Sequence, residues 1–171
     1  TIVFTYSQSN IHIKNVFSLL EAIVTIDMSA LIIGDGYLRD ELMSQYKHLS
    51  EKITWMKGIP NNELPNIMNQ STLFVLPSNS EGHPKILLEA MSCGMTVIGA
   101  NSPGIFEIIQ HGINGYLCKT DPDSICLAFE ELLSNTDLRK SLGHNAREYA
   151  LKNLSLEKIV KLEYDLYSSI V

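Results

Sequence analysis

The sequence predicts an α/β fold: a doubly wound, Rossmann-like parallel sheet of about six strands, followed by C-terminal helices. Two observations support this prediction. Up to about residue 118, short apolar runs alternate with segments of helical period, which is the pattern of β-α-β units. After residue 120 the pattern is purely helical. A length of 171 residues is typical of one domain, so we expect a single unit over 1–171.

Each strand is predicted from a short apolar run of the length that a buried strand needs. These runs are 2–6, 30–34, 53–57, 72–77, 96–100 and 115–118. Between them, helices are predicted near 14–27, 37–48, 62–69, 84–93 and 104–110. Asp121-Pro122 caps and starts a further helix, a second covers 135–152, and a last one, capped by Ser155, runs to Val171.

Composition excludes several classes of partner. The net charge is −6, and the basic residues are scattered, which argues against nucleic acid or an anionic membrane surface. No apolar run approaches the ~20 residues of a membrane span.

The three cysteines, Cys93, Cys118 and Cys126, lack metal-ligand spacing and are interpreted as small core residues in a reducing cytoplasm, with a catalytic thiol as the alternative. Because the chain starts at Thr1, we expect a fragment of a longer protein.

Doubly wound sheets bind ligands at the carboxyl ends of their strands, where the strand order reverses. The loops to inspect are therefore 7–14, 34–37, 77–84 and 100–104, which are rich in Gly, Ser, Asn or Pro. The informative stretch is 76–104, LPSNSEGHPKILLEAMSCGMTVIGANSPG. Gly82 would let a ligand approach the backbone closely, and Pro84 suits the first helical turn. The free amides at this helix start predict a site for an anion such as phosphate.

The helix over 84–93 is mostly apolar, with one polar wedge formed by Lys85, Glu89 and Ser92. Glu89 would lie ~7.5 Å along the axis from the helix start, within reach of a ribose whose diphosphate meets the helix end. The alternative is a solvent-facing pair of Lys85 and Glu89. Glu81 and Glu89 also leave open a glycosidase, in which two carboxyl groups flank the scissile bond.

These residues resemble the C-terminal domain of the retaining family 4 (group 1) glycosyltransferases of the GT-B fold. Glu81 through Glu89 match the family's E-x7-E motif. Other matching blocks follow in the family's order: Gly34-Asp35-Gly36, the strand end Trp55-Met56-Lys57-Gly58, Gly104 with Glu107, and the turn His111-Gly112-Ile113-Asn114-Gly115. The similarity covers nearly the whole chain.

The resemblance implies a donor site for a nucleotide diphosphate sugar, without a tightly bound metal or other cofactor. Glu89 would hold the ribose hydroxyls. Glu81 and the backbone of Gly82, His83 and Pro84 would meet the donor sugar and the phosphates, and Lys14 would neutralise the leaving diphosphate. Lys85, Gly34, Gly36 and Ser9 are further candidates for donor contacts, while His12 and His48 are interpreted as surface residues.

The resemblance also implies a setting for the whole protein. Transfer would retain the anomeric configuration, and the acceptor would be a glycan, a lipid or a protein bound by an N-terminal domain that is absent from this chain. The isolated fragment would not turn over. The family's commonest setting is bacterial surface-polysaccharide assembly in the cytoplasm, peripheral to the inner membrane. The last helix often packs toward the missing domain, so its apolar face near Leu166 is expected to favour self-association here.

The sequence departs from the family near the end of the first strand. Where relatives have Gly-Arg, this chain has Gln8 and Ser9, and Asn15 replaces the Gly that follows the lysine. One cation of the diphosphate clamp is therefore missing, and Lys85 or Arg39 would have to replace it. Two alternatives stay open: a degenerate domain that binds donor without transfer, and a nucleotide-sugar epimerase. A dinucleotide-dependent dehydrogenase is disfavoured, because no G-x-G-x-x-G follows the first strand.

Overall fold

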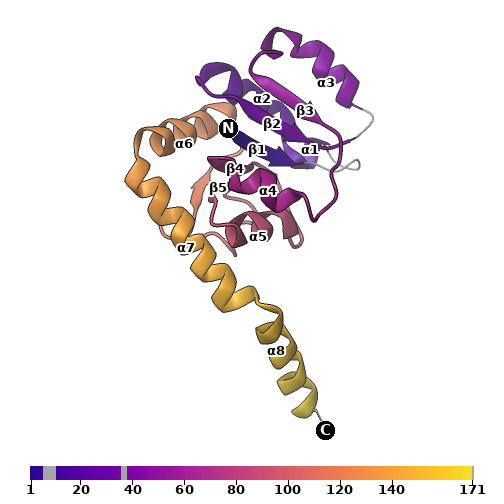
Figure 1. Cartoon of the computed structure of the whole chain (residues 1–171), viewed down its shortest axis with the longest axis vertical. Coiled ribbons are helices and arrows are strands. Elements are labelled where there is room, and N and C mark those ends of the chain that lie inside the picture. Colours follow the sequence, from indigo (N-terminus) through magenta and orange to yellow (C-terminus); the bar gives the residue numbers. More distant parts are fainter. Residues whose placement is uncertain (6–10, 36–37, 171) are drawn as a thin grey trace.

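The computed structural model describes residues 1–5, 11–35 and 38–170. Within them, one parallel sheet has the order β3-β2-β1-β4-β5-β6 (Figure 1). Its strands are β1 (Ile2–Thr5), β2 (Ala30–Ile33), β3 (Ile53–Met56), β4 (Leu73–Leu76), β5 (Thr96–Ala100) and β6 (Tyr116–Cys118). All six predicted strands are confirmed to within two residues. The chain winds outward from β1 to β3 and returns to β4 beside β1, so the strand order reverses between β1 and β4.

The helices connect successive strands and then continue beyond β6. They are α1 (Ile11–Lys14), α2 (Val16–Thr25), α3 (Arg39–Gln45), the 3₁₀ turn η1 (Lys47–Leu49), α4 (Leu64–Asn69), α5 (Lys85–Ser92), α6 (Pro122–Ser134), α7 (Thr136–Leu154) and α8 (Leu156–Ser168). The predicted doubly wound fold with C-terminal helices is thereby confirmed.

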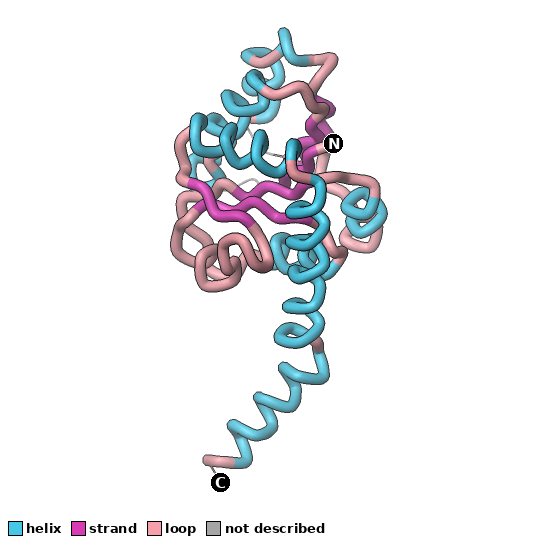
Figure 2. The backbone as a smooth tube through the Cα atoms, turned by 90° about the vertical axis from the view of Figure 1, so that its left-hand side faces the viewer, coloured by secondary structure: helices cyan, strands magenta, loops and turns pink. Residues whose placement is uncertain are grey.

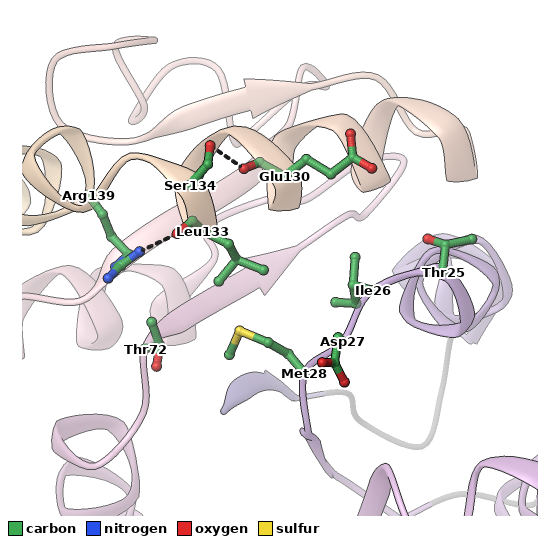
Figure 3. A pocket seen from close by; sticks show the side chains of 9 residues that line it. All are labelled: Thr25, Ile26, Asp27, Met28, Thr72, Glu130, Leu133, Ser134 and Arg139. Carbon is green, nitrogen blue, oxygen red and sulfur yellow. Dashed lines mark hydrogen bonds between the residues drawn. The ribbon is translucent and has the colours of Figure 1, made fainter.

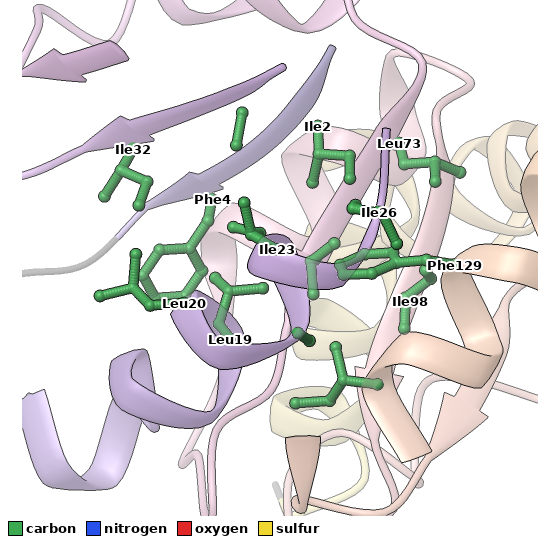
Figure 4. Close-up of a cluster of buried hydrophobic side chains, with 14 of the residues drawn as sticks. Ile2, Phe4, Leu19, Leu20, Ile23, Ile26, Ile32, Leu73, Ile98 and Phe129 are labelled. Carbon is green, nitrogen blue, oxygen red and sulfur yellow. The ribbon is translucent and has the colours of Figure 1, made fainter. Parts of the chain in front are cut away.

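Two apolar layers cover the two faces of the sheet. Ile2 and Phe4 of β1 point to the layer made with α2, α3 and α6, and Figure 4 shows them against side chains of α2 and Phe129. Val3, between them, faces the layer made with α4, α5 and α7. This alternation follows from the two-residue period of a strand, and burial on both faces explains why the strands read as nearly continuous apolar runs.

The predicted helix over 14–27 is interrupted at Asn15. Its backbone has φ 55° and ψ 41°, in the left-handed region, so α1 ends at Lys14 and α2 starts at Val16. Asparagine is one of the few residues that adopt this conformation readily. The interruption changes the direction of the chain immediately after Lys14.

The predicted helix over 104–110 is wrong. This segment forms successive turns, with the amides of both Ile105 and Phe106 donating to the carbonyl of Ser102. Gly104 has φ 83°, a left-handed value that a continuous right-handed helix does not allow. The apolar residues that suggested a helix, Ile105 and Ile109, are buried from these turns instead.

The C-terminal helices begin at the predicted caps. The carboxylate of Asp121 accepts a hydrogen bond from the amide of Ser124 at 2.8 Å, and the side chain of Ser155 accepts one from Lys158 at 3.3 Å. From there α8 extends away from the sheet and its helices (Figures 1 and 2). No helix in the described part of the chain is both long and apolar enough to cross a bilayer.

Candidate functional site

The reversal of strand order brings Lys14 and Glu81 together. Lys14 is the last residue of α1, after β1, and Glu81 lies in the loop that follows β4. Although the two are 67 residues apart in the sequence, Lys14 Nζ lies 2.6 Å from Glu81 Oε1. Only 17% of the Lys14 side chain and 11% of the Glu81 side chain are exposed. An ion pair so little exposed is screened less by salt than a surface pair.

The loop that carries Glu81 is fixed from two sides. On one side the amide of Asn79 donates to the carbonyl of Ile13 at 2.7 Å, and its side chain donates to the carbonyl of His12 at 2.9 Å. On the other side the amide of Glu81 donates to the carbonyl of Pro103 at 2.9 Å. The Glu81 carboxylate therefore has a defined position before any ligand arrives.

Gly104 provides the close packing beneath Glu81. A Cβ at this position would lie 2.0 Å from the Glu81 carbonyl oxygen, so only glycine allows the two backbones to meet. The Glu107 carboxylate accepts a hydrogen bond from the Gly104 amide at 2.6 Å and helps to hold the turn. The resemblance marked Gly104 and Glu107 as matches, and the structure gives both a role in supporting the Glu81 loop.

Asn15 links three loops at the carboxyl edge of the sheet. Its Nδ2 donates to the carbonyls of Pro77, at 3.2 Å, and Thr120, at 2.6 Å. Pro77 follows β4 directly, and Thr120 comes two residues after β6. Sequence reasoning noted Asn15 only as a departure from the family; the preference of asparagine for left-handed positions was the available signal.

The loop before α5 offers backbone donors to a ligand. Gly82 and His83 are exposed, and no atom would contact a Cβ built on Gly82. Among the described residues, no acceptor faces the amides of Gly82, His83 or Ile86, while the amide of Lys85 donates to the carbonyl of His83. Pro84 is the buried N-cap residue, so α5 begins one residue later than predicted. Open amides at a helix start are a feature that can bind an anion, as predicted for this loop.

Glu89 lies beside a cavity between α4 and α5. The cavity, of about 210 Å³, is lined by Asn61, Leu64, Pro65, Met68, Glu89, Ser92 and Cys93. Glu89 is half-buried and has no ion pair with Lys85, which is exposed; the described residues thus lack the solvent-facing pair of the alternative interpretation. A carboxylate at the rim of a largely apolar cavity can bind the hydroxyls of a ligand seated there.

The other residues predicted to contact the donor, or to lie at the surface, form no hydrogen bond with the Lys14–Glu81 pair in the described structure. Gly34 is buried, and its amide donates to the carbonyl of Met56 at 3.0 Å, which continues the pairing of β2 with β3. Ser9 and Gly36 lie outside the described residues. Arg39 is mostly buried, with its Nη1 3.5 Å from Asp40 Oδ1. His12 and His48 are exposed, as predicted.

The three cysteines are free thiols that differ in burial. Cys118 is buried, and burial raises the pKa of its thiol to about 12, so it stays protonated at neutral pH. Cys93 and Cys126 are half-buried rather than fully in the core. The described ranges contain no group of three or more His, Cys, Asp or Glu side chains placed to hold a metal ion.

A larger cavity of about 770 Å³ lies at the opposite edge of the sheet (Figure 3). Its lining includes Met28 and Thr72, which precede β2 and β4. The guanidinium of Arg139 in this cavity donates to the carbonyls of Leu132 and Leu133, at 2.6 and 3.4 Å. Arg139 therefore caps the C-terminus of α6. The cavity lies at the amino edge of the sheet, away from the Lys14–Glu81 pair at the carboxyl edge.

Fold and site together define a doubly wound α/β domain. Its ion pair and the loop with open amides lie at the topological switch point, an arrangement typical of nucleotide-binding enzymes. The family model described as "Glycosyl transferases group 1" matches residues 1–149. The chain belongs to this family of glycosyltransferases, as its resemblance implied.

Individual relatives agree with this assignment. The chain is 31% identical to N-acetyl-alpha-D-glucosaminyl L-malate synthase of Bacillus anthracis, over 93% of the chain and 42% of that protein. It is 26% identical to the C-terminal domain of a group 1 glycosyltransferase, LpcC, of Francisella tularensis, with a TM-score of 0.79 and coverage of 91% and 86%. Anabaena HepE, solved in complex with UDP-glucose, has a TM-score of 0.87 at 21% identity, over 98% of this chain and 48% of HepE. The chain thus spans less than half of the curated relative and of HepE, and these likenesses confirm the predicted C-terminal GT-B fold.

Proposed function

We propose that this chain is the donor domain of a retaining glycosyltransferase and binds a nucleoside diphosphate sugar. The observation that carries the proposal is the Lys14–Glu81 pair at the switch point, beside the open amides of Gly82, His83 and Ile86. A diphosphate needs this combination of a cation and several N–H donors.

In the proposed mode, the diphosphate lies at the start of α5 and its charge is met by Lys14. As the bond between sugar and phosphate breaks, negative charge develops on the leaving diphosphate, and a fixed ammonium group stabilises that charge. In this mode Glu81, held against Lys14, accepts hydrogen bonds from the hydroxyls of the donor sugar. The exposed Lys85 is the candidate for the cation that the family's arginine supplies.

Glu89 completes the site on the nucleoside side. Its position on α5, one turn beyond the open amides, suits a carboxylate that accepts hydrogen bonds from both ribose hydroxyls, with the base near the cavity beside α4. HepE, with UDP-glucose in its crystal structure, supports a uridine nucleotide as the first donor to test.

The rest of the proposal concerns the longer protein. The acceptor, a glycan, a lipid-linked sugar or a protein, would bind to an N-terminal domain, so this chain would bind donor without turning it over. Its relation to the Francisella C-terminal domain supports this division. We place the protein in a bacterial polysaccharide pathway, in the cytoplasm and peripheral to the inner membrane, with no metal or other cofactor.

Calorimetric titration of the chain with UDP, GDP, ADP and UDP-glucose tests the proposal. We expect one nucleotide series to bind and Glu89→Ala to weaken it by roughly ten- to a hundredfold, because a charged acceptor of two hydrogen bonds is lost. Glu148→Ala, on the exposed surface of α7, is the matched control and should bind like the wild type. Binding unchanged by EDTA is expected; absence of binding by every nucleotide would overturn the proposal.

The second candidate is a domain that binds donor but belongs to a protein without transferase activity. Gln8 and Ser9 at the family's arginine position favour it. A radiolabelled donor and the full-length protein separate the two: transfer or slow hydrolysis of the sugar supports the transferase, and tight binding with neither reaction supports the binding domain.

A further inference from the structure

Asn15 occupies a position that joins the two halves of the site. It directly follows Lys14, and it adopts the left-handed conformation between α1 and α2. Within the described residues it is the one non-glycine residue with positive φ. This conformation costs free energy for most residues. Any role of Asn15 can therefore arise from its backbone conformation as well as from its side chain.

The side chain of Asn15 connects to the strands at whose ends the site lies. One amide group, Nδ2, donates to the carbonyls of Pro77 and Thr120. Backbone carbonyls at strand ends have no further ladder partner, so these two bonds satisfy acceptors that would otherwise need water. Pro77 begins the loop that carries Glu81, so Asn15 fixes the start of that loop. Asn15 is also the direct neighbour of Lys14 in the sequence.

A second contact keeps the same two segments together. The Asn79 amide donates to the carbonyl of Ile13, so the loop after β4 and the end of α1 are bonded on both sides of Lys14. Lys14 has a long, flexible side chain, and only a fixed backbone brings it to one carboxylate oxygen. The 2.6 Å ion pair is the result.

We propose that Asn15 is a positioning residue that holds Lys14 against Glu81 through its bonds to Pro77 and Thr120. One consequence rests on the proposed function: Asn15 affects nucleotide binding through Lys14 alone. Its geometric part, the placement of Lys14, holds whether or not a nucleotide binds.

Two variants separate the side chain of Asn15 from its backbone. Asn15→Gly keeps the left-handed conformation and loses both hydrogen bonds, and Asn15→Asp keeps the conformation but has no N–H donors. The first readout needs no ligand: the rate at which an amine-reactive ester acylates Lys14, followed by peptide mass spectrometry. We expect both variants to raise this rate toward that of Glu81→Gln, in which the ion pair is broken directly.

Asn114→Gly is the matched control. The side chain of Asn114 also makes two hydrogen bonds to backbone, with Gln110 and Ile108, but in the turn before β6. This variant should lose thermal stability without faster acylation of Lys14. Wild-type acylation rates in both Asn15 variants, or an equal increase in Asn114→Gly, would overturn the inference.

A double-mutant cycle with UDP tests the link to the proposed function. We expect Asn15→Gly to weaken binding about fivefold in the wild-type background, as two hydrogen bonds no longer hold Lys14, and less than about twofold when Lys14 is already Ala. Equal effects in both backgrounds would show that Asn15 acts without Lys14. If the wild type binds no nucleotide, the proposed function fails while the acylation result still decides the role of Asn15.

Discussion

At the residue scale, Gly104 ties the turn after β5 to the position of Glu81. A methyl group at Gly104 meets two penalties: φ is 83°, and the Glu81 carbonyl oxygen would be 2.0 Å away. We expect Gly104→Ala to destabilise the fold by more than the ~1–2 kcal/mol that a left-handed alanine costs, because the Glu81 backbone must also move. Chemical denaturation measures the loss, and UDP titration should show weaker binding.

Gly112→Ala supplies the control for this prediction. Gly112 has a similar φ of 74°, but a Cβ at this position would meet no atom within 4 Å, so alanine there meets the conformational penalty alone. We expect Gly112→Ala to lower stability without affecting UDP binding. Equal losses of unfolding free energy in the two variants would show that the close contact between Gly104 and Glu81 does not add to the cost of alanine.

The candidate site could be predicted from the sequence only in part. Glu89 was identified from its place in a polar wedge of an otherwise apolar helix, which depends on local periodicity. The resemblance assigned Lys14 and Glu81 to the donor site, but it did not predict their ion pair, which arises from the order of β1 and β4 in the sheet. The bonds of Asn15 could not be foreseen, since they depend on two carbonyls brought together only by the folded loops.

At the element scale, the strands were predicted well because each forms a short apolar run, and the central strands β4 and β5 are buried along their whole length. The segment after β5 was mispredicted for a physical reason. Ile105 and Ile109 have the four-residue spacing of a helix, and the left-handed Gly104 outweighs that spacing. The capped starts of α6 and α8 were predicted correctly, because an N-cap bond is local to a few residues.

The cap of α6 predicts a pH dependence of stability. Bonds from the backbone amide and hydroxyl of Ser124 lower the pKa of Asp121 below its ordinary value of 3.8 in the folded chain. A depressed folded pKa means that the ionised cap stabilises the fold above the unfolded pKa and that this contribution is lost as pH falls through the folded pKa. The difference in stability between wild type and Asp121→Ala should therefore be constant near neutral pH and shrink below about pH 3.8.

Asn135→Ala is the natural comparison for Asp121→Ala. The side chain of Asn135 caps α7 by accepting a hydrogen bond from Leu138, and an amide does not titrate in this range. In urea unfolding followed by circular dichroism from neutral pH to below 3, its destabilisation should not vary with pH. A constant difference for both variants would contradict the assigned role of the Asp121 charge.

At the scale of the whole molecule, α8 is the element that the rest of the described chain leaves uncovered (Figures 1 and 2). Its exposed apolar residues lie on one broad face, which also carries Glu163: Ile159, Val160, Leu162, Tyr164, Leu166 and Tyr167. The opposite face has Lys158, Lys161 and Asp165, whose mixed charges do not favour an anionic membrane. In a longer protein, other parts of the polypeptide can cover the apolar face; in this chain alone a second copy is the available partner.

We therefore expect the isolated chain to self-associate through α8, with a sedimentation coefficient that rises with concentration. Leu162→Glu with Leu166→Glu should yield a monomer at every concentration, because two charges would enter the apolar contact. Ser168→Glu with Ser169→Glu adds the same charge on the polar side of the helix and should leave the association intact, which separates loss of apolar contact from general repulsion. A wild type that sediments as a monomer throughout would mean that an exposed face of this size is not sufficient for pairing, and α8 would then need a surface that this chain does not contain.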